Sequence, residues 1–193
     1  MNQPERFKAT ELFEIIVNKD AKYPFNLDFE LLPNIPKDVF KNKGIFSLYY
    51  RGELIYIGFS NSNEDIRTTR FVRQLQTITM RGALVQFNQS TIDLIPKLNQ
   101  ISKVLVDQNL IPQTKDYVTS VNRLYFSEHH WDEFSQLENG FLKFFEFDWY
   151  VITDNQNIEN SAKSLKSKYK PRCNKEFDLL IGLSNLLLIN LNK

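Results

Sequence analysis

The sequence predicts an α+β fold in which helices flank a small antiparallel or mixed β-sheet. Two runs rich in β-branched and aromatic residues, IFSLYY and ELIYIGF, flank an Arg-Gly turn, which is typical of a β-hairpin. Elsewhere apolar residues recur at helical spacing, as in residues 131–145. With 193 residues, of which 42% are hydrophobic, the chain is long enough to bury one core. We therefore expect a single domain.

The first 42 residues predict an N-terminal arm that precedes the hairpin. Apolar residues lie at helical spacing from Ala9 to Asn18, with Thr10 as a candidate cap, and this pattern predicts a helix. The proline-bearing stretch LLPNIPKD follows and interrupts regular structure. We place the end of the arm near Asn42.

The pattern of residues 44–81 predicts the hairpin, followed by a helix that carries arginines. The hairpin spans Ile45 to Phe59. Glu64 and Asp65 would lie in the first helical turn, where acidic side chains interact favourably with the helix dipole. Three arginines then follow at three-residue steps: Arg67, Arg70 and Arg73.

Residues 82–116 predict a helical insertion between the arginine helix and the next strand. The pattern from Thr91 to Leu110 is helical, and Pro96 marks a break or a late start within it. Pro112 ends the pattern.

The remaining residues, 117–193, predict two more strands and two more helices. YVTSVNRLYF, at 117–126, is interpreted as a third strand, and FDWYVIT, at 147–153, as a fourth. The segment 131–145 between them predicts a helix. The apolar run 177–191 is interrupted by polar residues and predicts a buried C-terminal helix.

Composition excludes several classes of protein. The single cysteine, Cys173, excludes an intramolecular disulfide and a multi-cysteine zinc site, and it indicates a reducing compartment. No apolar run approaches the roughly 18 residues of a membrane span, and the N-terminus is unlike a signal peptide. We therefore expect a cytoplasmic protein with no membrane partner. The net charge is +1, so any nucleic-acid-binding surface must come from local segregation of charge.

Three short motifs follow one another in a distinctive order. Gly44-Ile45-Phe46 lies on the first hairpin strand, Tyr56-Ile57-Gly58 lies on the second, and Arg67 comes after a polar loop. This order resembles the GIY-YIG nuclease family, whose members cut DNA with a tyrosine, an arginine, a glutamate and one divalent metal ion. The resemblance covers residues 44–73 well and the rest of the chain in outline. It implies a DNA-cutting enzyme.

The resemblance implies catalytic roles for Tyr56 and Arg67. Tyr56 would act as a general base or position the nucleophile, and the planar guanidinium of Arg67 would clamp the scissile phosphate. Arg70 is the alternative if the loop aligns differently. Phe46 stands where the family usually has a tyrosine, so three explanations compete: Tyr56 carries the proton chemistry alone, another side chain covers the role, or catalysis has been lost. We favour the first.

Two glutamates compete for the role of the family's metal ligand. Leu137-Glu138 followed by Phe141-Leu142 is similar to the family's Leu-Glu and apolar pair. Glu159 instead precedes the segment YKPRCN, which resembles the family's terminal motif, although the matching register there falls on Ala162. We prefer Glu138 as the catalytic glutamate and as the ligand of Mg²⁺ or Mn²⁺.

A basic run near residues 163–175 could contact DNA. Such a run is usually a solvated helix face, but in a nearly neutral protein this segregation is what phosphate binding requires. His129 and His130 lack metal-ligand spacing and are left outside the site. The candidate DNA contacts are Arg70, Arg73, Lys170, Arg172 and Asn174.

The arm and the insertion favour the compact restriction enzymes within this family. We therefore expect a Type II restriction endonuclease that cuts double-stranded DNA at a specific sequence and depends on a divalent metal ion. A homodimer is expected, because one small active site meets two strands most simply by doubling itself. The rival from another class is a catalytically inactive DNA-binding or protein-interaction module on the same scaffold. A third possibility is that the motif is a coincidence in an unrelated α+β protein.

Overall fold

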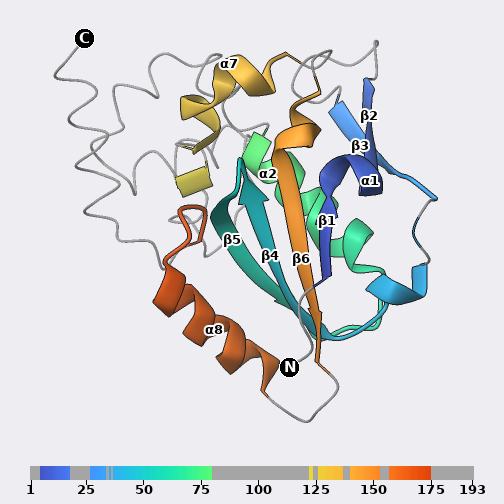
Figure 1. Cartoon of the computed structure of the whole chain (residues 1–193), viewed down its shortest axis with the longest axis vertical. Coiled ribbons are helices and arrows are strands. Elements are labelled where there is room, and N and C mark those ends of the chain that lie inside the picture. Colours follow the sequence, from blue (N-terminus) through green and yellow to red (C-terminus); the bar gives the residue numbers. More distant parts are fainter. Residues whose placement is uncertain are drawn as a thin grey trace, which may run out of the picture.

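A four-stranded antiparallel sheet organises the computed structural model of this chain (Figure 1). The structure describes residues 5–17, 27–33, 35, 37–79, 122–123, 126–136, 140–152 and 157–174. In spatial order, the strands are β1 (Glu5–Lys8), β6 (Phe145–Val151), β4 (Gly44–Tyr50) and β5 (Glu53–Ser60). Helices flank this sheet, so the α+β class and the small antiparallel sheet expected from the sequence are confirmed.

The predicted hairpin is β4 and β5. Arg51 and Gly52 form its turn with φ angles of 50° and 78°, the left-handed conformations that a tight hairpin turn requires. Pairing is regular from Gly44 opposite Ser60 to Leu48 opposite Tyr56. The hairpin therefore extends slightly beyond the predicted segment at both ends.

A β-bulge interrupts the hairpin next to Tyr56. Leu48 pairs with Tyr56, but the next residue, Tyr49, pairs with Leu54, so Ile55 is an extra residue on β5. Both Ile55 and Tyr56 consequently pack against the main core, although successive strand residues normally face opposite sides.

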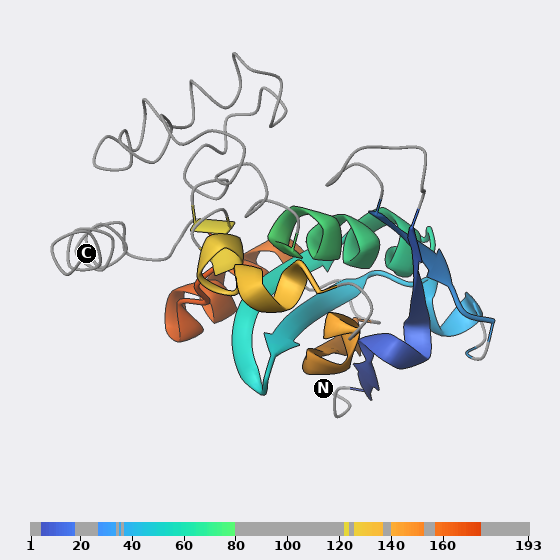
Figure 2. The ribbon, with the colours of Figure 1, turned by 90° about the horizontal axis from the view of Figure 1, so that it is seen from above.

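The two faces of the sheet are covered by different helices. The π-helix η2 (Arg67–Phe71) and helix α2 (Val72–Thr79) lie along one face, which we call the α2 face (Figure 2). Helix α8 (Ile158–Tyr169) packs on the other face, the α8 face, through Ile158 and Ala162 against Ile45 and Ile57. Because Tyr56 belongs to the main core with Phe71 and Leu75, its ring lies on the α2 face.

The N-terminal arm differs from the prediction. Helix α1 covers only Ala9–Leu12, since Phe13 begins strand β2 (Phe13–Val17), which pairs with β3 (Leu27–Leu31). The helix predicted over Ala9–Asn18 is therefore wrong beyond Leu12, because pairing with β3 overrides the local helical pattern. The arm also supplies β1, the edge strand of the main sheet, and the 3₁₀ helix η1 (Lys37–Phe40).

Two predictions in the second half of the chain are corrected. In the predicted third strand, 117–126, the described residues Asn122, Arg123 and Phe126 are helical, and buried Asn122 and Phe126 lie one helical turn apart. The predicted helix 131–145 is broken into α7 (Trp131–Phe134) and the 3₁₀ helix η4 (Phe141–Phe144), because Gly140 takes a left-handed φ of 62°.

The fourth predicted strand is confirmed as β6, which begins two residues earlier than expected. The predicted insertion at 82–116 and the predicted helix at 177–191 lie outside the described residues. Among the helices that the structure describes, none is long and apolar enough to cross a membrane.

Candidate functional site

The glycines of both hairpin motifs allow close packing around Tyr56. A Cβ atom on Gly58 would lie 2.3 Å from Cζ of Phe46 and 2.9 Å from Cε1 of Tyr56. A Cβ atom on Gly44 would lie 2.0 Å from the carbonyl oxygen of Tyr150, on the neighbouring strand. Real Cβ atoms do not approach other atoms so closely. Gly44 is therefore required by the backbone of β6, whereas a side chain at 58 would force the rings of Phe46 and Tyr56 to shift.

Phe46 is a core residue beneath Tyr56. It is 1% exposed, and its ring lies 5.8 Å from that of Tyr56 and 5.2 Å from that of Phe71. A phenylalanine therefore fills this position by packing between the hairpin and η2. Tyr56 itself remains partly exposed, as a residue that meets a substrate must be.

Arg67 is buried in a local ion pair. Its side chain is 2% exposed, and its Nε and Nη2 atoms donate to the carboxylate of Asp65 at 3.0 and 2.7 Å. Its Nη1 donates to the carbonyl oxygen of Ile35 at 3.3 Å, and the guanidinium stacks on Phe40 at 4.7 Å. All three nitrogen atoms of this guanidinium therefore donate hydrogen bonds to groups within the protein.

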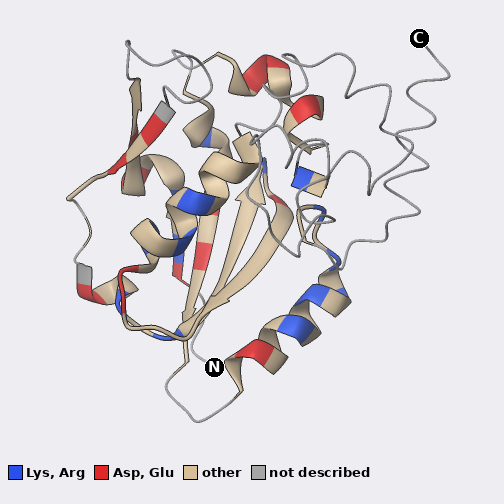
Figure 3. Ribbon diagram, turned by 180° about the vertical axis from the view of Figure 1, so that it is seen from behind, with Lys and Arg blue, Asp and Glu red and all other residues tan. Residues whose placement is uncertain are grey.

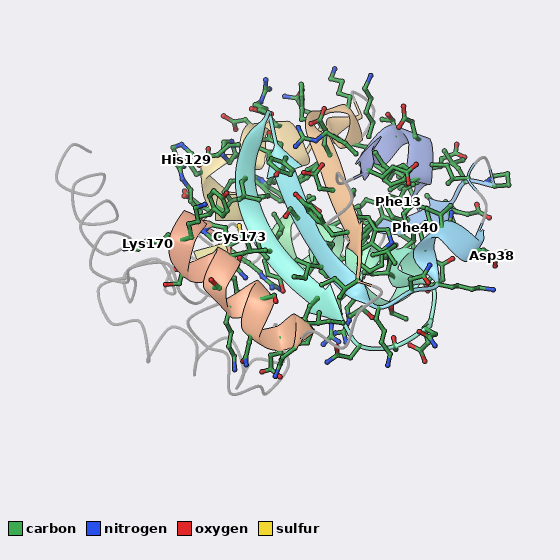
Figure 4. All side chains as sticks on the ribbon, turned by 60° about the horizontal axis from the view of Figure 1, so that its bottom comes forward. Phe13, Asp38, Phe40, His129, Lys170 and Cys173 are labelled. Carbon is green, nitrogen blue, oxygen red and sulfur yellow. The ribbon has the colours of Figure 1, made fainter. Side chains whose placement is uncertain are left out.

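The described contacts do not bring Arg67 and Tyr56 together. Phe40, on which Arg67 stacks, packs 5.0 Å from Phe7 of β1, at one edge of the sheet. Tyr56 lies on β5, at the opposite edge. In Figure 4, Phe40 lies on one side of the strands, and Cys173, whose backbone N–H donates to the carbonyl oxygen of Ile55 on β5, lies on the other. Arg70, the alternative from the sequence, is exposed on η2.

The arginine that lies at Tyr56 is Arg123. Its guanidinium carbon is 4.9 Å from the centroid of the Tyr56 ring, and its Nη1 donates to Oγ1 of Thr77 on α2 at 2.9 Å. Arg123 was not predicted from the sequence, because the pattern of residues 117–126 favoured a strand. The helical spacing of Asn122, Phe126 and His130 is the signal that would have placed it on a helix instead.

Asn174 ties the chain after α8 to the second hairpin motif. Its Nδ2 donates to the carbonyl oxygen of Ile57 at 2.9 Å, and its Oδ1 accepts from the backbone N–H of Ile57 at 2.8 Å. Cys173 adds a backbone hydrogen bond to Ile55, and Asn122 donates to the carbonyl oxygen of Asn174 at 2.9 Å. Segment 171–174 thus covers the open edge of β5 as an additional strand would.

In this position, Asn174 and Cys173 are buried and contribute to the fold. Asn174 is 2% exposed, and both polar atoms of its side chain are used within the protein, so its side chain does not face DNA. Burial raises the pKa of the Cys173 thiol to about 12, so this cysteine stays protonated and unreactive at neutral pH.

Replacing Asn174 with alanine is expected to lower the free energy of unfolding by about 2–4 kcal/mol. The substitution would leave the buried N–H and carbonyl of Ile57 without their partners, and each unsatisfied group costs about 1–3 kcal/mol. Urea unfolding measures this loss. Asn157→Ala is the matched control, because that asparagine makes an exposed cap hydrogen bond to Asn160 worth about 1 kcal/mol. Equal losses in the two variants would contradict the role of Asn174.

Of the two candidate glutamates, the structure describes only Glu159, and it lies away from Tyr56. Glu159 is exposed on α8, pairs with Lys163 at 3.0 Å and belongs to the helix that covers the α8 face, whereas Tyr56 faces α2. Ala162, where the family's register falls, is buried against the sheet. Glu138 lies outside the described residues.

The residues that the structure describes do not fit a magnesium site. They contain no group of three or more carboxylate, histidine or cysteine side chains that could hold a metal ion. The carboxylate of Asp65 is taken by Arg67, and that of Glu133 accepts from Tyr50 and Arg51. Glu138, the metal ligand that the sequence favours, lies outside this part of the chain.

A second polar cluster joins the hairpin turn to α7. Burial of Glu133 by itself would raise the pKa of its carboxyl, but the hydroxyl of Tyr50 and the guanidinium of Arg51 outweigh this effect and lower the pKa. His130 packs 4.8 Å from the Tyr50 ring, where burial lowers its pKa to about 4. His130 is thus neutral at pH 7 and serves packing at the turn.

Basic side chains gather on two helices. Figure 3 shows Lys and Arg along α8 and on η2 and α2. Arg70 and Arg73 are exposed on the arginine helix, and Lys170 and Arg172 are exposed just after α8. Arg172 forms an exposed ion pair with Glu53 at 2.9 Å, which a phosphate could replace at little cost.

Comparisons with models of known protein families, with curated proteins and with solved structures find no match to this chain.

The resemblance of residues 44–73 to the GIY-YIG nuclease family therefore stays a prediction from the sequence.

Proposed function

We propose that this protein is a metal-dependent DNA endonuclease on a GIY-YIG-like scaffold. More specifically, we propose a Type II restriction endonuclease that cuts double-stranded DNA as a homodimer with Mg²⁺ or Mn²⁺. The observation that carries the proposal is the pairing of the Asn174 amide with the Ile57 peptide. It joins the two segments that resemble the family's second and terminal motifs, which are 117 residues apart in sequence. The contact between these two segments supports the proposal.

The geometry at Tyr56 supports hydrolytic chemistry. Tyr56 pairs with Leu48 and faces the α2 side of the sheet with it, where a guanidinium lies over the Tyr56 ring. A hydroxyl that can accept or position a proton, beside a cation that can stabilise phosphate charge, meets two requirements of phosphodiester hydrolysis.

Glu138 remains the proposed metal ligand. A bound divalent ion would stabilise negative charge on the phosphate. The described residues contain no cluster of three or more ligating side chains for it.

DNA binding would draw on the exposed basic residues on both sides of the molecule. Arg70 and Arg73 lie on the arginine helix, and Lys170 and Arg172 follow α8. Their charges would contact phosphates and make binding sensitive to salt, although the whole chain carries a net charge of only +1.

An inactive DNA-binding module on the same scaffold is the second candidate. Three observations favour it: Phe46 has no hydroxyl, the guanidinium of Arg67 is buried in an ion pair, and Glu159 lies on the helix of the opposite face. The module would bind DNA and leave it intact.

Cleavage of a mixed panel of DNA by the purified full chain distinguishes the two candidates. We expect discrete fragments with Mg²⁺ or Mn²⁺ and none with a chelator. Glu138→Gln should lower the rate by about 10³-fold or more, since a metal ligand that stabilises transition-state charge is lost. Glu159→Gln is the matched control and should stay within about twofold of the wild type, because Glu159 forms only an exposed ion pair. Salt-sensitive binding without cleavage would establish the inactive module.

A further inference from the structure

We infer that Arg123 supplies the guanidinium that holds the scissile phosphate beside Tyr56, the role expected of Arg67 from the sequence. This inference rests on the proposed nuclease function and names a residue for it that lies outside the family-like motifs. The arginines of the described chain differ in how their charge is neutralised.

Four of these arginines stack on an aromatic ring, and three of the four have a carboxylate partner. Arg6 stacks on Tyr49 and pairs with Asp148, Arg51 stacks on Phe144 and pairs with Glu133, and Arg67 stacks on Phe40 and pairs with Asp65. Arg123 stacks on Tyr56 but has no carboxylate partner among the described residues. Within the part of the chain that the structure describes, no carboxylate competes with an outside anion for this positive charge.

The hydrogen bonds of Arg123 leave one edge of its guanidinium for a ligand. Nη1 donates to Thr77, while Nε is buried and has no acceptor among the described residues. A buried donor without an acceptor is rare and costs free energy, so it requires an explanation. Nε and Nη2 together form the edge that binds two oxygens of one phosphate side by side. A phosphate bound there would satisfy Nε.

A buried amide on the neighbouring helix adds a second unsatisfied group. Gln74 is 7% exposed, and its Oε1 has no hydrogen-bond partner in the described structure. Gln74 precedes Thr77 by one turn of α2, and Thr77 is the residue to which Arg123 donates. An unpartnered acceptor on α2 and an unpartnered donor on Arg123, which is bonded to α2 through Thr77, thus lie on adjoining elements, as expected where a substrate or its ordered water completes the network.

The polar network around Asn174 holds Arg123 in place. Its neighbour Asn122 is 8% exposed and donates to the carbonyl oxygen of Asn174, whose side chain is bonded to Ile57. Ile57 directly follows Tyr56. The position of the guanidinium relative to the tyrosine is therefore set by buried hydrogen bonds and not by the flexible Arg123 side chain alone, which is how a preorganised phosphate site is built.

Arg123→Lys and Arg123→Ala test this inference against Arg51→Ala, a matched control that also removes a stacked arginine. We expect cleavage to fall about 100-fold or more in both Arg123 variants, with a far smaller change in KM, since Lys keeps the charge but loses the bidentate edge. Arg51→Ala should cleave within about threefold of the wild type. Millimolar guanidinium ion should restore about tenfold of the lost rate to Arg123→Ala alone. Thermal unfolding verifies that all variants are folded.

Two results would overturn the inference. The first is cleavage by Arg123→Ala at a rate within about threefold of the wild type. The second is a loss of cleavage in Arg123→Ala that guanidinium ion does not restore, together with an unchanged salt dependence of DNA binding. If the wild-type protein cuts no DNA, the nuclease proposal fails separately. Arg123 is then judged by binding alone: Arg123→Ala should reduce the slope of log affinity against log salt by about 1, and an unchanged slope would reject the phosphate contact.

Discussion

Tyr56→Phe is expected to lower the rate of DNA cleavage by about 10²–10⁴-fold, the usual contribution of a positioned general acid or base. The substitution removes one hydroxyl and keeps the ring that packs against Phe46 and Arg123. Stability should therefore change by no more than about 1.5 kcal/mol, the usual net worth of one hydrogen bond, and DNA affinity should be retained. Single-turnover cleavage under saturating enzyme measures the chemical step directly.

The chain offers a matched control for Tyr56 on the same hairpin. Tyr49 is also a strand tyrosine, but it packs under Arg6 near Asp148, away from the main core to which Tyr56 belongs. Tyr49→Phe should cut DNA at close to the wild-type rate. Equal rates in both variants would show that the Tyr56 hydroxyl has no part in the reaction. Equal losses in both would point to the stability of the hairpin as the cause.

Asp65→Ala is expected to lower the free energy of unfolding by about 3–5 kcal/mol, because it leaves the buried guanidinium of Arg67 without its counter-charge. The same substitution removes the acceptor for the backbone N–H of Arg67 at the start of η2. Chemical unfolding measures the loss. A change below about 1 kcal/mol would mean that Arg67 finds water or another partner and is not confined by Asp65.

A double variant separates the two contributions of this ion pair. Asp65→Ala with Arg67→Met replaces the charge by an apolar side chain of similar length that can still pack on Phe40. We expect the double variant to be more stable than Asp65→Ala alone, with a coupling energy of about 1–3 kcal/mol. If Arg67 serves the fold and not the phosphate, the double variant should still cleave DNA. Loss of cleavage in a folded double variant would return the phosphate role to Arg67.

Local sequence signals were sufficient for the hairpin. Arg51 and Gly52 take the left-handed turn, and the alternation on either side of them sets the strands. The glycines at 44 and 58 could be recognised as motif residues from the sequence. Their reason, contact with Tyr150 and Phe46, depends on neighbours that only the sheet supplies.

Long-range pairing overruled local patterns at the N-terminus. The segment after Leu12 has a helical pattern of apolar residues, yet it pairs with β3 as strand β2. β1 lies at the edge of the main sheet because it pairs with β6, which is distant in sequence. Arg6 of β1 and its partner Asp148 of β6 are 142 residues apart. No local pattern carries information about a partner so distant.

For the candidate site, the sequence by itself determined the hairpin, Tyr56 on its second strand, an arginine helix after it, and the terminal Pro-x-x-Asn segment. Only the tertiary structure decided which arginine meets Tyr56, which face α8 covers, and that Asn174 binds the Ile57 peptide. The reason is physical. Strand and turn preferences act over a few residues, whereas charge burial and hydrogen-bond satisfaction are settled between segments that meet only when the chain folds.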